Sequence, residues 1–276
     1  MNFGCLLDMD GVIYRGSEVI PGAPEFIRYL TTANIPYLFL TNNSAPTQLD
    51  ILLKLKKFGI ETTQDHIYTS AMATAEWVVR QKPDASAYVI GENGLLSALN
   101  EARIPITRDK PDFVIVGEGR TLNFEMLEIA HRAIDAGAGF VSTNADTWCP
   151  TDAGPRPGCG AIAACLQAAT GIDPYHVGKP NPFMFRAARK KLDLSTDEVL
   201  MIGDTMETDI RGATDLGFKN ILVLTGSTPG KELDDYAFRP TLIVDSIASL
   251  VPPTSSRKAG NAEAILGLID SLRKRR

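Results

Sequence analysis

Two aspartates with one residue between them lie near the start of the chain, after a short apolar run. The run is Phe3–Leu7, and Asp8 and Asp10 follow it. An apolar run of this length that ends at a turn signal is typical of a buried parallel strand, and side chains at i and i+2 of an extended chain point the same way. Two neighbouring carboxylates repel unless a cation lies between them, and Mg²⁺ prefers such oxygen ligands. Taken alone, the pattern with Gly11 is also typical of an ordinary turn.

Three further polar clusters follow or precede predicted elements in the same way. They are Thr41-Asn42-Asn43-Ser44, Gly178-Lys179-Pro180, and Gly203-Asp204-Thr205 with Asp209. In doubly wound sheets, ligands bind outside the carboxyl ends of the strands, so we expect all four clusters to meet there. Each cluster also has a plain alternative, as a turn, a helix cap or a surface lysine.

Strand and helix patterns alternate along the first third of the chain and again after residue 182. Predicted strands cover 3–7, 35–40, 66–69, 199–202, 220–224 and 241–244, and predicted helices cover 21–33, 45–58, 71–81, 182–191 and 206–216. This alternation predicts an α/β fold, with a doubly wound (Rossmann-like) parallel sheet and right-handed crossovers.

A second alternation starts after a boundary near Lys82–Asp84. Its strands are predicted at 87–90, 113–116 and 140–142, and its helices at 94–102, 124–135 and 161–170. We therefore expect a core domain over 1–82 and 176–251, with a smaller α/β domain over 83–175 inserted in it as a cap. The remaining sequence, 252–276, predicts a linker followed by a short helix over 262–272 with basic residues at its end.

Composition excludes several classes of protein. The chain of 276 residues has a net charge of −5, which argues against nucleic acid as the main partner. No apolar run approaches the ~20 residues of a membrane span, and because the first predicted strand comes so early we expect no leader segment. The four cysteines show no CxxC pairing, so we expect no zinc site and a reduced, cytoplasmic setting.

Five motifs carry a resemblance to a known family. They are LLDMDGVIYRG, FLTNNS, TNADTWCP, VGKPNP and IGDTMETDI, in this order along the chain. The chain resembles the haloacid dehalogenase-like phosphatases over residues 3–251, and more closely the NagD-like subgroup, whose α/β cap lies between the second and third core motifs. Such a combination is far more specific than any one motif alone.

The resemblance implies a role for each catalytic position. Asp8 would be the nucleophile that forms an aspartyl-phosphate, and Asp10 the general acid and then base. Thr41 would donate its hydroxyl to the phosphoryl oxygens, and Lys179 would neutralise the transferring group.

The resemblance also implies a Mg²⁺ site and a substrate-binding surface. Asp8, Asp204 and the backbone carbonyl of Asp10 would hold the metal. Asp209 and Thr205 would lie behind these ligands, and Asp209 would hold a water on the metal or Lys179. Substrate contacts would come from Thr41, Asn42, Asn43, Asn144, Asp146, Gly158 and Lys179. Relatives more often have proline at 145, an aromatic residue at 149, and asparagine or arginine at 205; here these are Ala145, Cys149 and Thr205.

Three functions follow from this reading. The first is a Mg²⁺-dependent phosphatase acting on a small phosphorylated metabolite such as a nucleoside monophosphate, a sugar phosphate, pyridoxal phosphate or phosphoglycolate. The second is a phosphotransferase with an acceptor other than water, and the third is a non-catalytic phosphate-binding regulator. No nucleic acid or membrane partner is expected, and a homo-oligomer through the cap is a further expectation.

Overall fold

The computed structural model describes residues 3–151, 153–228, 230–252 and 267. The chain forms two compact units, which are described separately. The first comprises Met1–Leu40, Leu52–Ile67 and Phe185–Arg276, and the second comprises Thr41–Ile51 and Tyr68–Met184. The predicted helix over 262–272 lies outside the described residues, apart from Gly267.

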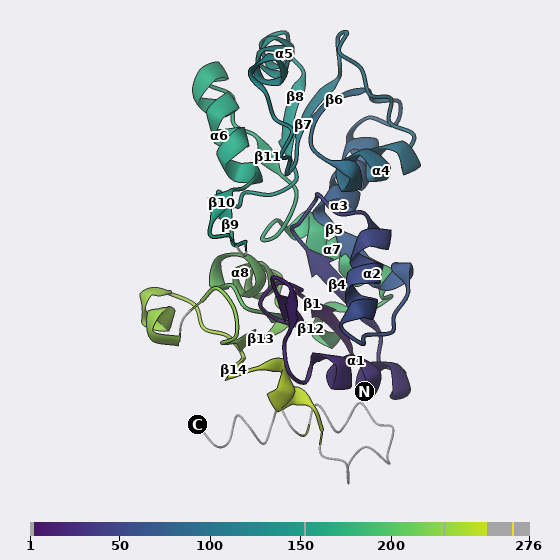
Figure 1. Ribbon diagram of the computed structural model, residues 1–276, viewed down its shortest axis with the longest axis vertical. Coiled ribbons are helices and arrows are strands. Elements are labelled where there is room, and N and C mark those ends of the chain that lie inside the picture. Colours follow the sequence, from purple (N-terminus) through teal and green to yellow (C-terminus); the bar gives the residue numbers. More distant parts are fainter. Residues whose placement is uncertain (1–2, 152, 229, 253–266, 268–276) are drawn as a thin grey trace. The chain divides into compact units, whose positions relative to one another are not determined.

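A six-stranded sheet with the order β14-β13-β12-β1-β4-β5 provides the framework (Figure 1). Its strands are β1 (Gly4–Leu7), β4 (Tyr37–Thr41), β5 (Ile67–Thr69), β12 (Val199–Gly203), β13 (Lys219–Val223) and β14 (Leu242–Val244). Strand β1 pairs in parallel with both β4 and β12, and the β12–β13 and β13–β14 pairs are parallel as well. The chain builds outward from β1 in both directions, so the order reverses between β1 and β12, where such sheets bind ligands.

Strand β1 is central because its sequence is apolar on both faces. Cys5, Leu6 and Leu7 have no exposed surface, as expected for a strand covered on both sides. Burial alone raises the pKa of the Cys5 thiol to about 12. This thiol therefore remains protonated and packs as a small apolar side chain.

Helices connect these strands near the predicted positions. They are α1 (Ala23–Thr32), α2 (Gln48–Lys57), α3 (Ser70–Gln81), α7 (Pro182–Lys191) and α8 (Arg211–Asp215), with short turns η1 (Gln64–His66), η2 (Thr196–Glu198), η3 (Met206–Ile210), η4 (Gly230–Asp235) and η5 (Ile247–Leu250). The helix predicted over 206–216 begins instead as the wider π-helical turn η3, and only its second half is α-helical. Such π-turns often occur at functional sites.

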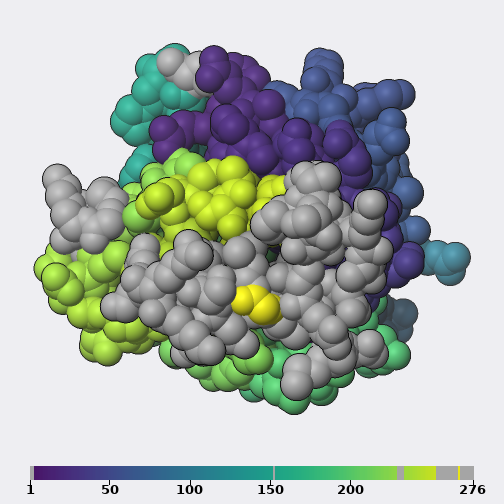
Figure 2. Space-filling model, turned by 90° about the horizontal axis from the view of Figure 1, so that it is seen from below, coloured from purple at the N-terminus to yellow at the C-terminus, as the bar shows by residue number. Residues whose placement is uncertain are grey.

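The N-terminal helix packs against the last described turn of the chain. A Cβ atom on Gly22 would lie 2.5 Å from the Cα of Ala248 in η5, so the absence of a side chain permits this contact. Figure 2 shows the face on which yellow-green residues from the C-terminal part border purple N-terminal ones. Glycine is also required here because its φ is +89°.

A second sheet, with the order β11-β8-β7-β6, is also parallel. Its strands are β6 (Ala87–Ile90), β7 (Phe113–Val116), β8 (Gly139–Ser142) and β11 (Tyr175–His176), joined by α4 (Asn93–Glu101), α5 (Phe124–Asp135) and α6 (Cys159–Thr170). Its core contains Tyr88, Ile90, Val114, Phe140 and Leu166, among others. These strands come between β5 and β12 in sequence, which confirms the predicted α/β fold with an inserted α/β segment.

Two short hairpins were not predicted. Strands β2 (Tyr14–Arg15) and β3 (Glu18–Val19) form one, and β9 (Trp148–Cys149) and β10 (Arg156–Pro157) form the other. Two-residue strands are too short to show a periodic pattern. Among the described residues, no helix has the length and apolar character needed to cross a membrane.

The unit boundaries differ from the predicted domain boundaries. Thr41–Ile51 and Tyr68–Gln81 belong to the second unit together with the four-stranded sheet, whereas the sequence pattern places them in the core. The compact units do not follow the limits of the two sheets, so the domain boundaries at 82/83 and 175/176 stay predictions.

Candidate active site

The first unit brings two predicted metal ligands together at the point where the strand order reverses. Asp8 follows β1, and its backbone N–H donates to the carbonyl of Ile202 in β12 at 2.9 Å. Asp204 follows the last residue of β12. Both aspartates are buried, with 8% and 2% exposure. The hydrogen-bond ladder of the sheet therefore holds the two carboxylates at one edge.

A third carboxylate, that of Asp209, completes the cluster. One oxygen from each of Asp8, Asp204 and Asp209 lies within 4.8 Å of the others, and all three residues are buried. A Cβ atom on Gly203 would lie 2.2 Å from the Cβ of Asp209, so only glycine allows this approach. Three buried carboxylate oxygens at this spacing fit a hard divalent cation such as Mg²⁺.

The loop after β13 supports Asp204, a role that was not predicted. The backbone N–H of Ser227 donates to Asp204 Oδ2 at 2.5 Å, and that of Thr228 donates to the Asp204 carbonyl at 3.2 Å. A Cβ atom on Gly226 would lie 1.9 Å from Asp204 Oδ2. The signal that could have found this loop is its Gly-Ser-Thr composition directly after a buried strand.

Thr205, which directly precedes η3, donates hydrogen bonds to the carboxylates of both Asp204 and Asp209. Its hydroxyl donates to Asp204 Oδ1 at 3.1 Å, and its backbone N–H donates to Asp209 Oδ2 at 3.2 Å. The π-helical turn also places the backbone N–H of Asp209 3.0 Å from the Thr205 carbonyl. Two carboxylates are thus oriented by one residue that is itself not ionisable.

Asp10 is exposed, unlike the three clustered aspartates. The hydroxyl of Tyr14 in β2 donates to Asp10 Oδ2 at 3.4 Å, and the Tyr14 backbone carbonyl accepts from the N–H of Gly11 at 2.8 Å. Burial, together with the charges of Asp10 and Asp8, raises the pKa of Tyr14 well above its ordinary value. The tyrosine therefore stays protonated and acts as a donor toward Asp10.

The second unit contains Lys179, which is 3% exposed. The side chain of Asn42 bonds its backbone twice: Lys179 N donates to Asn42 Oδ1 at 2.8 Å, and Asn42 Nδ2 donates to the Lys179 carbonyl at 3.0 Å. A Cβ atom on Gly178 would lie 2.6 Å from Asn42 Oδ1, so glycine is needed beside this contact. The Asn42 side chain thus holds the lysine backbone, and the predicted donation from backbone N–H groups of Asn42 and Asn43 to the substrate stays a prediction.

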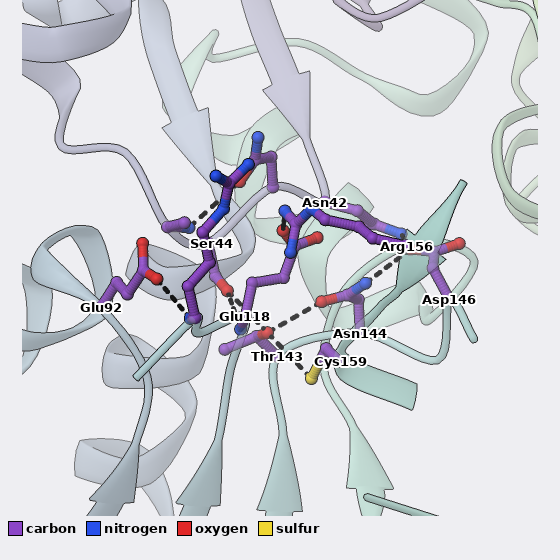
Figure 3. A network of polar contacts seen from close by, with 12 residues as sticks. Asn42, Ser44, Glu92, Glu118, Thr143, Asn144, Asp146, Arg156 and Cys159 are labelled. Carbon is purple, nitrogen blue, oxygen red and sulfur yellow. Dashed lines mark hydrogen bonds and ion pairs between the residues drawn. The ribbon is translucent and has the colours of Figure 1, made fainter. Parts of the chain in front are cut away.

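The predicted cap residues Asn144 and Asp146 extend this network (Figure 3). Asp146 Oδ2 accepts from Asn42 Nδ2 at 2.8 Å and from Asn144 Nδ2 at 2.6 Å. Asn144 has no exposed surface. A Cβ atom on Gly158 would lie 2.5 Å from the carbonyl of Asp146. The residue that precedes α6 is therefore packed against the backbone of Asp146.

Thr41 and Asn43 form a tight turn at the end of β4. The backbone N–H of Asn43 donates to Thr41 Oγ1 at 3.1 Å, and Asn43 Oδ1 accepts from the N–H of Ala45 at 3.1 Å. Because the Thr41 hydroxyl accepts a hydrogen bond here, its own proton can be donated to another oxygen. The turn leaves Thr41 3% exposed.

The predicted site residues thus fall into two groups. Asp8, Asp10, Asp204, Thr205 and Asp209 belong to the first unit, and Thr41, Asn42, Asn43, Asn144, Asp146, Gly158 and Lys179 belong to the second. In the first group Asp8, Asp204, Thr205 and Asp209 lie close together. In the second group hydrogen bonds join Asn42, Asn144, Asp146 and the Lys179 backbone. The meeting of the two groups stays a prediction.

Comparison with known families gives the identity of this arrangement. A haloacid dehalogenase-like hydrolase model matches residues 5–105, and a second model of HAD-like hydrolases matches residues 176–250. Together the two matches cover more than half of the chain, on either side of a gap that holds most of the four-stranded sheet. The chain belongs to the haloacid dehalogenase-like hydrolases.

Curated relatives of this haloacid dehalogenase-like hydrolase are named as a phosphatase and as a 5'-nucleotidase. The chain is 41% identical to dihydroxyacetone phosphatase of Corynebacterium glutamicum (strain R) over 91% of both chains. It is 39% identical to the 5'-nucleotidase YutF of Bacillus subtilis (strain 168) over 90% of this chain and 97% of that protein. The solved structure of NagD from E. coli K-12 matches with a TM-score of 0.85 and 36% identity, over 90% of this chain and 98% of the other. The chain is therefore a NagD-like phosphomonoester hydrolase.

Proposed function

We propose that this hydrolase is a Mg²⁺-dependent phosphatase that cleaves a small phosphomonoester through an aspartyl-phosphate on Asp8. The observation that carries the proposal is the cluster of Asp8, Asp204 and Asp209, whose carboxylate oxygens lie within 4.8 Å of one another in a buried setting. Buried carboxylates at this spacing need a cation to offset their repulsion.

The reaction divides into two displacements. A carboxylate oxygen of Asp8 attacks phosphorus, and the leaving alkoxide takes a proton from Asp10 as the P–O bond of the ester breaks. In the second step Asp10 removes a proton from water, and that water attacks phosphorus and releases Asp8 and inorganic phosphate. Tyr14, which donates to Asp10, would orient the carboxylate for both proton transfers.

The aspartate cluster would bind the metal. Asp8, Asp204 and the backbone carbonyl of Asp10 would hold Mg²⁺, with Asp209 beside them either as a ligand or through a water. When bound, the ion would neutralise negative charge on the phosphoryl oxygens.

Lys179 and Thr41 complete the proposed site by stabilising the transferring group. In support, β4, which ends at Thr41, is hydrogen-bonded in parallel to β1, which precedes Asp8. The carboxyl ends of adjacent parallel strands share an edge of the sheet. Asn42, through its two hydrogen bonds to the Lys179 backbone, would fix the position of the Lys179 Cα and so orient the lysine side chain.

The proposed substrate is a small phosphorylated metabolite. The relatives act, by name, on dihydroxyacetone phosphate or on nucleotides, and both lie within the classes predicted from the sequence. A cytoplasmic location and an oligomer formed through the inserted segment stay part of the proposal.

Hydrolysis of p-nitrophenyl phosphate tests the proposal. We expect turnover to vanish in excess chelator and to return on addition of Mg²⁺, and we expect Asp8→Asn to lose turnover while retaining phosphate binding. Turnover of Asp8→Asn equal to that of wild type would exclude the covalent route. Addition of an acceptor alcohol separates the alternatives, since a phosphotransferase would form a new phosphoester and a regulator would release no phosphate at all.

A further inference from the structure

A lysine of α2 lies over the ring of Tyr14 and has no part in the chemistry above. The Nζ of Lys54 is 3.6 Å from the centroid of the Tyr14 ring. The ring of Phe58, which follows α2, has its centroid 5.6 Å from the centroid of the same ring, at an interplanar angle of 39°. All three residues belong to the first unit. Since residues at i and i+4 share a face of a helix, the end of α2 places a cation and an aromatic side chain against the tyrosine.

Lys54 differs in burial from the other lysines at the end of α2. Lys56 and Lys57 are exposed, whereas Lys54 is half-buried. Removing part of an ammonium group from water costs free energy, and attraction to the negative face of an aromatic ring offsets that cost. The Lys54 ammonium is therefore positioned against the tyrosine ring, while its two neighbours are solvated surface charges.

The turn that contains Asp10 is held by contacts that do not use the Tyr14 hydroxyl. The N–H of Gly11 donates to the Tyr14 backbone carbonyl at 2.8 Å, and the hydroxyl of Thr225 donates to the Gly11 carbonyl at 2.6 Å. The Tyr14 hydroxyl instead donates to the carboxylate of Asp10, at 3.4 Å. Changes to that hydroxyl, or to Lys54, should therefore leave the backbone of the turn in place and affect the carboxylate.

The carboxylate of Asp10 needs such a contact because the residue is exposed. An exposed side chain can occupy several rotamers, and proton transfer requires the one that brings the carboxyl group within hydrogen-bond distance of the leaving oxygen. The bond from Tyr14 is long, and contacts of this kind often shorten when substrate binds. A positive charge over the ring polarises it and makes the phenolic O–H a better donor. Lys54 would thus strengthen the contact that orients Asp10.

We propose that Lys54 is a positioning residue, which acts through the hydroxyl of Tyr14 to hold Asp10 in the orientation that protonates the leaving group. The proposal rests on the proposed function, because it assigns how the proton donor of that reaction is held. The effect of losing Lys54 should then depend on how much the leaving group needs a proton. A lysine that only supports the fold would affect all leaving groups alike.

Three phosphate esters with one aromatic ring each test this dependence. p-Nitrophenolate is a stable anion and departs without a proton, phenolate is less stable, and the alkoxide of benzyl alcohol departs only with a proton. The ratio of kcat/KM for benzyl phosphate to that for p-nitrophenyl phosphate measures the help given by the proton donor, because kcat/KM includes the steps up to departure of the leaving group. A loss of folded protein cancels in this ratio.

Replacement of Lys54 should lower the ratio. In Lys54→Met we expect it to fall by about fivefold or more, and in Tyr14→Phe, which keeps the ring and removes the hydroxyl, by about tenfold or more. Phenyl phosphate should show smaller falls in both variants. Lys54→Arg retains a cation at this position and should restore most of the wild-type ratio. The matched control is Lys56→Met, at an exposed position of the same helix, which should give the wild-type ratio.

A double-mutant cycle tests whether the lysine acts through the hydroxyl. In the Tyr14→Phe background there is no hydroxyl to act on, so adding Lys54→Met should not lower the ratio further. A further fall of the same size would show that Lys54 affects the leaving group by another route and would overturn the inference. Asp10→Asn calibrates the series, since it removes the proton donor and should give the largest fall.

The remaining outcomes separate the inference from the proposed function. An equal loss on all three esters in Lys54→Met, or no loss on any of them, contradicts a positioning role. Wild type that hydrolyses p-nitrophenyl phosphate but neither of the other esters contradicts it as well, because no oriented donor would then assist departure. Absence of Mg²⁺-dependent hydrolysis of p-nitrophenyl phosphate, or an unchanged ratio in Asp10→Asn, would instead reject the proposed function.

Discussion

The side-chain amide of Asn42 bonds both polar groups of the Lys179 backbone, accepting from its N–H at 2.8 Å and donating to its carbonyl at 3.0 Å. These residues are 137 positions apart in sequence. One side-chain amide thus pairs both backbone polar groups of a lysine that lies outside the strands of the described residues.

Removal of that amide should impair the chemical step more than substrate binding. In Asn42→Ala, we expect kcat for p-nitrophenyl phosphate to fall by about tenfold to a hundredfold, because a displaced lysine stabilises the transferring group poorly. Steady-state kinetics on several phosphate esters measures this. A rise in KM that differs between substrates, with kcat unchanged, would show that Asn42 contacts the substrate directly. Asn100→Ala, at an exposed position of α4, serves as the control.

Mg²⁺ should stabilise the folded protein through the aspartate cluster. Two ionised carboxylates whose oxygens lie within 4.8 Å of each other repel by about 3.5 kcal/mol or more at an effective dielectric constant near 20. A bound cation relieves that repulsion only in the folded state. We expect the Tm to rise with Mg²⁺ in wild type and to rise less in Asp209→Asn. Calorimetry with and without chelator measures both shifts. Equal shifts in the two proteins would place the ion elsewhere, and Asp215→Asn, on the exposed side of α8, is the matched control.

The loop that follows β13 should set metal affinity through its glycine. A Cβ atom at position 226 would lie 1.9 Å from Asp204 Oδ2, so Gly226→Ala must displace the carboxylate or the loop. We expect the Mg²⁺ concentration for half-maximal activity to rise by about tenfold, as for other changes to groups that orient metal ligands. Gly119→Ala, whose added Cβ would have no neighbour nearer than 3.6 Å, should leave that concentration unchanged. Unaltered metal dependence in Gly226→Ala would mean that Asp204 does not bind the ion.

His176 should make the folded state less stable in mild acid. Burial lowers the pKa of His176, and its Nδ1 lies 2.5 Å from Ser142 Oγ. Since the unfolded chain then binds a proton more readily than the folded one, the stability is highest above the unfolded pKa of about 6.5 and falls as pH drops below that value. We expect the Tm of His176→Gln to decline less than that of wild type between pH 7.5 and pH 5, by thermal unfolding at each pH. The same change at His131, which pairs with Asp135 on the surface of α5, should preserve the wild-type slope.

The sequence predicted the parallel sheets and the gathering of Asp8, Asp204 and Asp209 at one edge of the first sheet, because both depend on local rules. Apolar runs such as Val199–Gly203 become buried strands, and polar residues at their carboxyl ends gather at one edge. It could not predict which loops support those residues. The Gly-Ser-Thr composition of the loop after β13 indicates a turn there. The contact of the Ser227 N–H with Asp204 depends on a backbone atom, which every residue has, so composition does not reveal that hydrogen bond.

Helix α2 shows a second limit of sequence patterns. The spacing of Leu49, Leu52, Leu53 and Leu55 predicts an apolar face made of these four residues, but Leu49 and Leu53 are 52% and 50% exposed. The buried side instead contains Ile51 and Leu55, at 4% and 0% exposure. Both pairs have i, i+4 spacing, so periodicity supports either face, and only the packing of neighbouring elements decides between them.

The four-stranded sheet has a hydrophobic core of its own, built from residues between Tyr88 and Leu166. A segment that is stabilised by its own interior can be exchanged without rebuilding the framework around it. Chimeras that graft this segment from other phosphatases onto the six-stranded framework should therefore inherit the donor's choice of alcohol while keeping the recipient's phosphoryl-transfer machinery. The insertion would then act as an interchangeable module, through which new substrates are acquired without altering the aspartates.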